Sequence, residues 1–277
     1  HQKITNFEAL NRKITMNNVD AAILARAQAW LDGDYDAETK AGVEALLNGN
    51  DADAIIDSFY RDLEFGTGGM RGIMGVGTNR MNKYTIGDAT QGLSNYLLQQ
   101  FAGQQIKVAL AHDSRNNATL FAQIVADVFS ANGIKVYFFD GLRPTPELSF
   151  AIRHLGCQSG VMLTASHNPK EYSGFKAYWN DGGQIIAPHD KNIIGEVMKI
   201  TDVSQINFNA KPELIERIGA EIDQLFIDTI TKVSIDREAI AAQRDLTIVF
   251  SPIHGTAVDI VPRALKQLGF TNVHLVE

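Results

Sequence analysis

A serine in the run Thr164-Ala165-Ser166-His167-Asn168-Pro169 has the setting that most strongly suggests chemistry. It follows an apolar run, which predicts a loop at the end of a buried strand, and Lys176 comes ten residues later. A hydroxyl in such a loop can attack an acyl carbon, accept a phosphoryl group, or only form a turn hydrogen bond. The serine by itself leaves all three roles open.

Two features count against acyl transfer at Ser166. No glycine flanks the serine, although a G-x-S-x-G elbow requires glycines on both sides. His167 is the nearest base in the sequence, and we expect its side chain to diverge from that of Ser166, because adjacent side chains in an extended loop point apart.

Metal and nucleotide sites find little support elsewhere in the chain. His112, Asp113 and His254 are metal-ligating residue types, but no H-x-x-x-H pair or carboxylate cluster accompanies them. The glycine-rich run 65–77 departs from the G-x-G-x-x-G pattern because Arg71 replaces its final glycine, and no G-K-[ST] follows. These glycines instead indicate a backbone that approaches a ligand or another strand closely.

Five alternating elements must position the loop at 165–174 that contains Ser166, called the serine loop. Apolar runs separated by turn residues predict strands at 106–111, 134–139 and 159–164, and helices at 118–131 and 146–155. Strands joined by crossover helices lie parallel, and ligands bind beyond their carboxyl ends. Polar loops follow those ends at 112–117, 140–145 and 165–174.

Further elements are expected on both sides of this unit. Helical spacing of apolar residues predicts helices within 1–60 and at 86–101. A hairpin is expected from 175–179 and 184–187, and an amphipathic helix from Leu214 to Val233. A strand, a helix and a strand follow at 246–250, 258–268 and 272–276.

These patterns predict an α/β fold in three segments. A helical leader at 1–60 packs on a three-layer α/β/α domain with a mostly parallel mixed sheet at 61–205. Residues 206–277 form a linker helix and the truncated start of a second, similar domain. One β-α-β unit cannot cover its own sheet, so we expect chain outside this sequence to complete the second domain.

Composition places the chain among folded globular proteins. Its 277 residues are 45% hydrophobic and 21% charged, close to the averages of globular domains. The formal net charge of −7 comes with scattered lysines and arginines, so no nucleic-acid surface is expected. No run approaches the ~18 apolar residues that cross a membrane. The single cysteine excludes an intrachain disulfide, so we expect a cytoplasmic location.

Several motifs resemble those of one enzyme family. T-A-S-H-N-P followed by G-F-K resembles the phosphoserine signature of the α-D-phosphohexomutases, the phosphoglucomutases and phosphomannomutases. F-G-T-G-G-M-R-G, H-D-S-R and R-P-T-P-E-L resemble further elements of that family in the same order, and P-I-H-G-T resembles one in its second domain. The resemblance runs from about Phe65 to the end, and is greatest to the bacterial phosphoglucomutase branch.

The resemblance implies a role for each matching residue. Ser166 would carry a phosphoryl group, give it to a sugar monophosphate, and recover one from the bisphosphate. Lys176 matches the proposed general acid/base, and His167 matches an acid/base partner. Arg71 matches the arginine beside the phosphoserine, where it would bind phosphate oxygens and lower the pKa of Lys176.

Two more residues, Arg115 and Asn168, are expected in substrate binding. The main assignments also have plainer alternatives. Lys176 can be a solvated residue of an edge strand, Arg71 can neutralise a carboxylate, and His167 can donate to a backbone carbonyl.

The family binds Mg²⁺ through the phosphoserine, here Ser166, and three aspartates of a D-G-D-x-D-R loop. Neither that loop nor the sugar-selecting G-E-x-S-G loop occurs in this sequence. We therefore expect an N-terminal part of a longer enzyme, inactive alone, with Mg²⁺ and a glucose 1,6-bisphosphate-type activator in the full-length protein.

The expected function is an intramolecular phosphotransferase that interconverts the 1- and 6-phosphates of glucose, mannose or both. Its partners would be small sugar phosphates and the rest of its own polypeptide. The alternative is a non-catalytic sugar-phosphate-binding protein that retains the serine loop. An unfinished sheet with exposed apolar faces favours the first interpretation.

Overall fold

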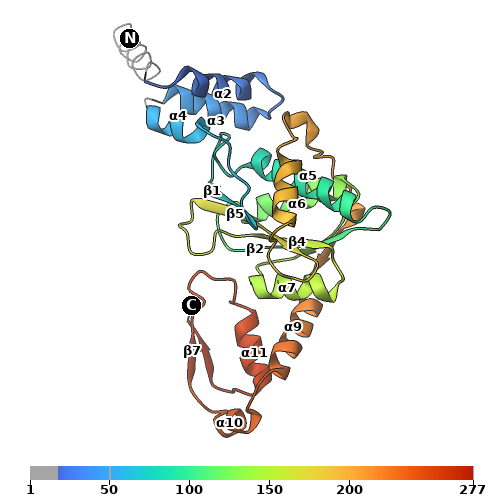
Figure 1. The fold of residues 1–277 in the computed structure, drawn as a ribbon. Coiled ribbons are helices and arrows are strands. Elements are labelled where there is room, and N and C mark those ends of the chain that lie inside the picture. Colours follow the sequence, from blue (N-terminus) through green and yellow to red (C-terminus); the bar gives the residue numbers. More distant parts are fainter. Residues whose placement is uncertain (1–17, 50, 277) are drawn as a thin grey trace.

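The computed structural model of the protein describes residues 18–49 and 51–276. Part of the predicted leader, residues 1–17, lies outside the described residues. Three parts follow one another along the chain, namely a small group of helices, a central α/β part and a C-terminal unit (Figure 1).

The first part contains helices α2 (Ala21–Asp32), α3 (Ala37–Asn48) and α4 (Ala52–Phe59). Each begins at an aspartate, Asp20, Asp36 or Asp51, whose carboxylate accepts a backbone N–H of the first turn. Buried aromatic side chains join the helices to the central part. Trp30 lies edge to face with Phe59 and with Tyr84 of the next helix. The helices expected in this region are confirmed for its described residues.

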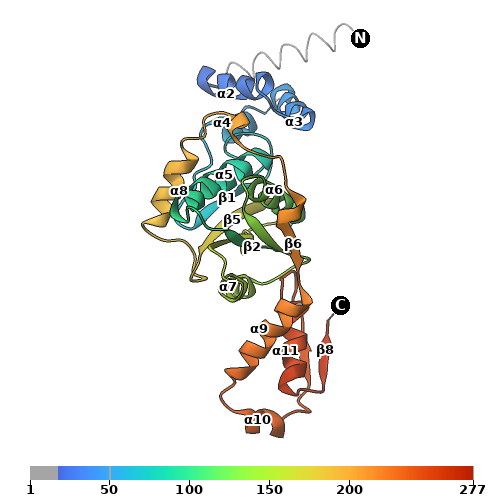
Figure 2. The same ribbon diagram turned by 90° about the vertical axis from the view of Figure 1, so that its right-hand side faces the viewer.

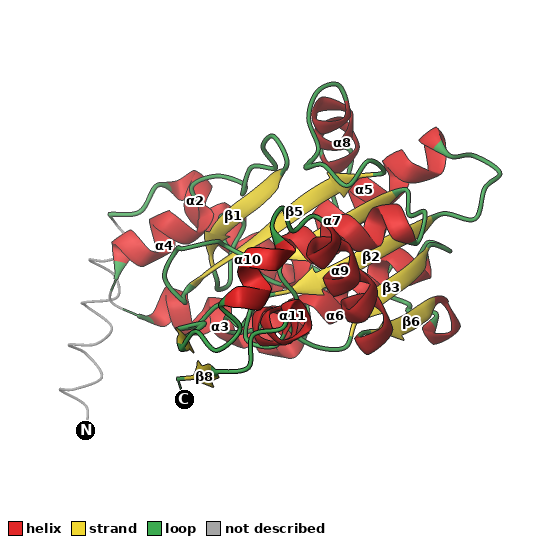
Figure 3. Cartoon of the chain, turned by 90° about the horizontal axis from the view of Figure 1, so that it is seen from below, coloured by secondary structure: helices red, strands yellow, loops and turns green. Residues whose placement is uncertain are grey.

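The central part is a six-stranded mixed sheet. Its strands lie in the order β1 (Gly69–Ile73), β5 (Tyr172–Trp179), β4 (Ser159–Leu163), β2 (Lys107–His112), β3 (Lys135–Phe139) and β6 (Ile215–Ile218). Strands β4, β2, β3 and β6 run parallel to one another, whereas β5 runs antiparallel to β4 and to β1. Figure 3 shows the strands side by side in this order.

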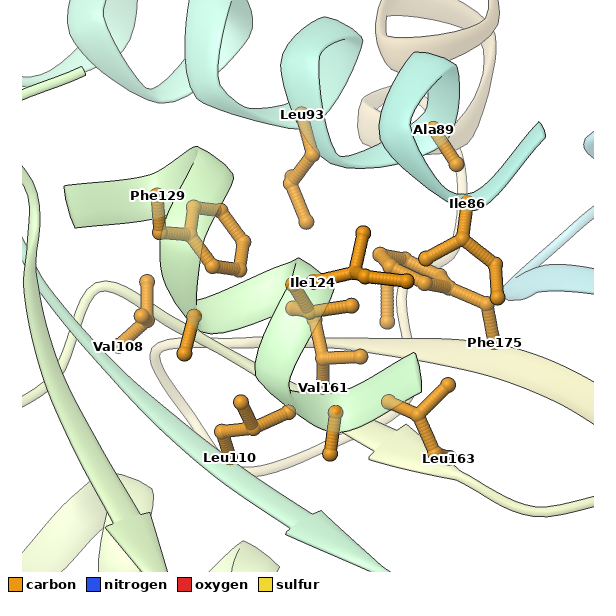
Figure 4. Close-up of a cluster of buried hydrophobic side chains, with 14 of the residues drawn as sticks. Ile86, Ala89, Leu93, Val108, Leu110, Ile124, Phe129, Val161, Leu163 and Phe175 are labelled. Carbon is orange, nitrogen blue, oxygen red and sulfur yellow. The ribbon is translucent and has the colours of Figure 1, made fainter. Parts of the chain in front are cut away.

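Helices cover both faces of this sheet. Helices α5 (Lys83–Gln100) and α6 (Ala118–Ala131) share one buried cluster with the sheet, and α7 (Thr145–His154) belongs to a second cluster on the opposite face. Figure 4 shows Leu93 of α5 pointing into the cluster that contains Phe129 of α6, while Ile86 of α5 lies beside Phe175 of β5. Helix α8 (His189–Val197), which the sequence did not predict, packs on α5. The predicted three-layer α/β architecture is therefore confirmed.

Two predicted elements take another form. The hairpin expected around 180–183 is present only as a short antiparallel turn, in which Tyr178 bridges to Gln184 and the N–H groups of Trp179 and Ile185 donate to the carbonyl oxygens of Gly183 and Ala177. Most of β5 pairs with β1 and β4 instead. The helix expected from Leu214 begins at Ala220 instead, and Ile215–Ile218 forms β6. These residues supply the backbone partners that the edge of β3 would otherwise lack.

The C-terminal unit continues from the sheet (Figure 2). It consists of α9 (Ala220–Lys232), α10 (Arg237–Ala242), β7 (Ile248–Phe250), α11 (Ile260–Leu268) and β8 (Val273–Leu275). Strands β7 and β8 pair in parallel in a separate two-stranded sheet, as the sequence predicted. Val249 and Leu275 of these strands are 67% and 53% exposed. The domain limits at 60 and 205 stay predictions.

No helix of residues 18–49 or 51–276 combines the length and the apolar character needed to span a bilayer.

A buried polar network connects the central part to the C-terminal unit. Arg143, in the loop after β3, donates to both carboxylate oxygens of Asp223 on α9 at 2.6 and 3.0 Å. Arg263 of α11 donates to the same carboxylate at 2.9 Å. The carboxylate of Asp223 on α9 therefore binds one cation from the central part and one from the C-terminal unit.

Glu147 of α7 is the unusual member of this network. Its side chain is fully buried, and no donor in the described structure reaches its carboxyl oxygens, the nearest cation being Nε of Arg143 at 3.8 Å. Within the described residues, no hydrogen bond therefore offsets the cost of ionising Glu147 inside the protein. Burial and the charge of Asp223 raise the pKa of Glu147 from 4.5 to about 8.

The pKa of Glu147 predicts a pH dependence of stability. Between pH 4.5 and about 8 the folded state retains a proton that the unfolded state releases, so the free energy of unfolding falls with rising pH. Glutamine cannot ionise. We therefore expect the fall in the free energy of unfolding between pH 5 and pH 8 to be smaller in Glu147→Gln than in wild type, by on the order of 3 kcal/mol. Urea unfolding from pH 5 to pH 8 measures it. Glu216→Gln, at a half-exposed carboxylate of β6, is the control, and parallel pH profiles of Glu147→Gln and wild type would contradict the assignment.

Candidate functional site

Ser166 follows β4, at the carboxyl end of the parallel strands, and its side chain is exposed. Its φ of 56° lies in the left-handed region, which costs a residue with a side chain about 1–2 kcal/mol. Its backbone N–H donates to Oγ1 of Thr164 at 3.0 Å, which supports this turn. A strained, exposed serine at the ligand-binding edge of an α/β sheet is a typical arrangement for a reactive group.

His167 lies closer to Ser166 than the sequence suggested. Nδ1 of His167 is 3.3 Å from Oγ of Ser166, so the expectation that the two side chains diverge is wrong. The left-handed backbone at Ser166 breaks the extended geometry on which that expectation rested. In the part of the chain that the structure describes, no carboxylate or carbonyl holds the second ring nitrogen of His167. A serine-histidine pair without an orienting third group is an incomplete acyl-transfer site.

Arg71 reaches the serine loop from β1. It stands opposite Gly174 in the β1–β5 pairing, and its Nη1 donates to Oδ1 of Asn168 at 2.9 Å. A Cβ at Gly174 would lie 2.5 Å from the carbonyl oxygen of Thr164, so only glycine permits the loop to fold back against β5. No carboxylate of the described residues pairs with Arg71, so its plainer predicted role does not describe this geometry.

Lys176 lies on β5, between β1 and β4, so it is not on an edge strand as its plainer alternative required. Its pKa is lowered, first by burial and second by the positive charge of Arg71, while Asp113 acts in the opposite direction. The sequence attributed this effect to Arg71, and the structure adds burial as the larger cause. An amine with a lowered pKa is a better proton acceptor near neutral pH.

The side chains of Arg115 and Asn168 both form hydrogen bonds that stabilise the serine loop. The guanidinium of Arg115 donates to the carbonyl oxygen of Ser166 at 2.9 Å, and the amide oxygen of Asn168 accepts from Arg71. Their predicted role in substrate binding stays a prediction. Two roles were not predicted from the sequence. Oγ1 of Thr164 accepts the backbone N–H of Ser166, and the carboxylate of Asp113 accepts a hydrogen bond from Arg115. The spacing Asp-x-Arg directly after a buried strand was the available signal.

The described residues do not fit an Mg²⁺ site. Among residues 18–49 and 51–276, no three His, Cys, Asp or Glu side chains gather to hold a metal ion. A phosphate on Ser166 would supply oxygen ligands, but Mg²⁺ prefers six oxygens in near-octahedral geometry.

A cavity of about 780 Å³ lies elsewhere, where the leader helices meet α5. Trp30, Tyr84 and Asp88 are among the residues that line it, and none of the predicted site residues does. This cavity is thus separate from the serine loop.

Comparison with known proteins gives consistent results. Residues 62–204 match the family model of phosphoglucomutase/phosphomannomutase, alpha/beta/alpha domain I. A phosphoglucomutase of Staphylococcus haemolyticus is 36% identical over 79% of this chain and 40% of its own length. A Schizosaccharomyces pombe protein assigned as a phosphoribomutase is 33% identical over 91% of this chain and 43% of its own length.

Solved structures agree in fold. A Thermus thermophilus protein assigned as a phosphomannomutase superposes with a TM-score of 0.62 at 25% identity, over 78% of this chain and 46% of that protein. The Paramecium phosphoprotein parafusin superposes with a TM-score of 0.59 at 17% identity, over 77% of this chain and 44% of that protein. The chain thus spans less than half the length of each protein that it matches here.

The position of Arg71 predicts a measurable effect on Lys176. We expect Arg71→Gln to raise the pKa of Lys176 towards its ordinary value without reaching it, because burial remains. Carbon NMR titration of the lysine side chain measures this pKa. Arg71→Lys keeps the positive charge and should preserve the lowered pKa. The same Lys176 pKa in wild type and Arg71→Gln would contradict the coupling.

Proposed function

Because the chain belongs to the phosphoglucomutase/phosphomannomutase family, we propose that Ser166 is the phosphoryl carrier of a sugar-phosphate mutase. The observation that carries this proposal is the left-handed, exposed serine at the carboxyl end of β4, with Arg71 and Lys176 beside its loop. Phosphoryl transfer depends mainly on positioning and charge neutralisation, which such a loop supplies.

The reaction needs two transfers at one serine. In the first, the phosphorus–oxygen bond to Ser166 breaks as a hydroxyl of the sugar monophosphate attacks; a base takes the hydroxyl proton, and an acid protonates the departing Oγ of Ser166. In the second, the resulting bisphosphate returns its other phosphoryl group to Oγ of Ser166, whose proton must be restored to the departing sugar oxygen. Lys176, whose pKa is lowered, and His167, 3.3 Å from the serine oxygen, are the candidate acid and base groups.

Glucose and mannose phosphates are the proposed substrates, with a glucose 1,6-bisphosphate-type activator that loads the serine. The names of relatives, phosphoglucomutase and phosphoribomutase, support sugar phosphates as a class. We also propose that turnover requires the longer polypeptide, because this chain spans 40% of the Staphylococcus haemolyticus enzyme and holds no Mg²⁺ ligand set among its described residues.

Replacing the carrier hydroxyl tests this function. In the full-length polypeptide, Ser166→Ala should lower the rate of interconversion of glucose 1-phosphate and glucose 6-phosphate by on the order of 10⁴-fold or more, because no oxygen remains to carry the phosphoryl group. A coupled assay of glucose 6-phosphate measures the rate. Ser204→Ala, at an exposed turn hydroxyl, should leave it unchanged. Undiminished activity of Ser166→Ala would overturn the proposal.

A further inference from the structure

Every donor of the Arg115 guanidinium is already used within the protein. Nε donates to Oδ2 of Asp113 at 2.9 Å. Nη1 donates to the carbonyl oxygens of Pro169 and Tyr172, both at 2.8 Å. Nη2 donates to the carbonyl oxygens of Ser166 and Asn168 at 2.9 and 3.1 Å. A guanidinium has five N–H donors in a fixed planar fork, so these five bonds leave none for a ligand.

Asp113 fixes the orientation of this guanidinium. Its Oδ1 accepts the backbone N–H of Arg115 at 3.1 Å, while its Oδ2 accepts from Nε. The side chains of Arg115 and Asp113 are only 8% and 13% exposed, so the pair is little screened by water. The backbone N–H of Asp113 also donates to the carbonyl oxygen of Leu163 at 3.1 Å, at the last residue of β4. The pair is therefore anchored to the rigid sheet.

The four bound carbonyl groups span the serine loop from end to end. They belong to residues 166, 168, 169 and 172, which converge on one planar cation. Arg115 holds the carbonyl group of Ser166 and Oγ1 of Thr164 holds its N–H, so the backbone is restrained on both sides of the Ser166 Cα, where φ is 56°. Strained conformations of this kind persist only where the surroundings determine them from several directions.

We infer that Arg115 and Asp113 are positioning residues that hold Ser166 in its left-handed conformation, and that Arg115 does not bind the substrate phosphate. The inference deepens the proposed carrier function and rests on it for its kinetic consequence. It also replaces substrate binding, the role predicted for Arg115 from the sequence. A phosphate at this guanidinium would have to displace loop carbonyls and would lie against the carboxylate of Asp113.

Two conservative variants test the pair in the full-length polypeptide. Arg115→Lys keeps the charge but offers three donors without the planar fork. Asp113→Asn keeps the shape and removes the charge that orients the guanidinium. Arg217→Lys is the matched control, since Arg217 lies on β6 over the ring of Phe138 and donates to Gln123. Thermal unfolding establishes that each variant folds, and Asp113→Asn carries the test if Arg115→Lys does not fold.

The kinetic readout is the rate at which glucose 1,6-bisphosphate phosphorylates Ser166, followed by intact mass. A misplaced nucleophile costs on the order of 100-fold in rate. We expect losses of about that size in both variants, with kcat lowered, KM little changed, and no further loss in the double variant, because the two residues act as one unit. Arg217→Lys should behave as wild type.

Substrate binding by Arg115 predicts a different pattern. Arg115→Lys would then raise KM, while Asp113→Asn would leave phosphorylation unchanged or faster, because it removes a negative charge near an anion. That pattern, or wild-type rates in both variants, would overturn the positioning role.

Hydrogen exchange separates this inference from the carrier function. The amides of Asn168 and Tyr172 donate within the loop, to the carbonyl oxygens of Ala165 and Pro169. They should exchange faster in Arg115→Lys and Asp113→Asn than in wild type, whether or not Ser166 is phosphorylated. Unchanged exchange would contradict the positioning role. A wild-type protein that takes up no phosphoryl group would contradict only the carrier function.

Discussion

The close approach of β1 to β5 is the constraint on which the site depends. Gly69 has a φ of 139°, and a Cβ at this position would lie 1.8 Å from the carbonyl oxygen of Phe175. No side chain can be accommodated there, so glycine alone lets the two strands pair in their observed register. That register places Arg71 opposite Gly174 and Gly69 opposite Lys176. The cations of two strands far apart in sequence thereby meet beside one serine loop.

The C-terminal unit is attached by charges as well as by apolar contacts. Ile222 of α9 belongs to the cluster beneath α7, whereas Ile227 of the same helix packs with Ile260 of α11. Asp223 lies between these clusters and receives Arg143 and Arg263. Buried ion pairs contribute little net stability, but removing one partner leaves an uncompensated charge, so they fix geometry more than they add stability. The network therefore fixes the direction of α9 relative to the six-stranded sheet. Hydrophobic contacts alone are less directional and would fix it less precisely.

Local patterns predicted the parts of the fold that depend on neighbours in sequence. The helix expected at 118–131 coincides with α6, because its apolar face and the turn at Asn132-Gly133 are both encoded locally. Strands β1 and β6 depend on distant partners, β5 and β3, and the sequence did not predict either as a strand. Ile215–Ile218 carries apolar residues that fit a helix continuing into α9 equally well. Only the free edge of β3 decides between the two structures.

The same distinction applies to the site. Ser166, Arg71 and Lys176 were identifiable from motifs, because their residue types and order carry the signal. The 3.3 Å contact of His167 with Ser166 and the five bonds of Arg115 were not, because both follow from one positive φ and from carbonyl directions. Side-chain identity predicts which residues take part, whereas backbone geometry determines what each of them can reach.

The charge state of the serine itself completes the electrostatics of the proposed carrier. With Ser166 unmodified, burial and Arg71 hold the pKa of Lys176 below its ordinary value. A phosphoryl group on Ser166 would add about −1.5 to −2 charges near these cations and would favour the protonated lysine. The proton affinity of Lys176 would then rise when the serine is loaded and fall when it is empty. In the proposed mutase, a lysine placed in this way would gain a proton in one half of the reversible transfer and release it in the other, so the proposed carrier and acid/base group would need no separate switch.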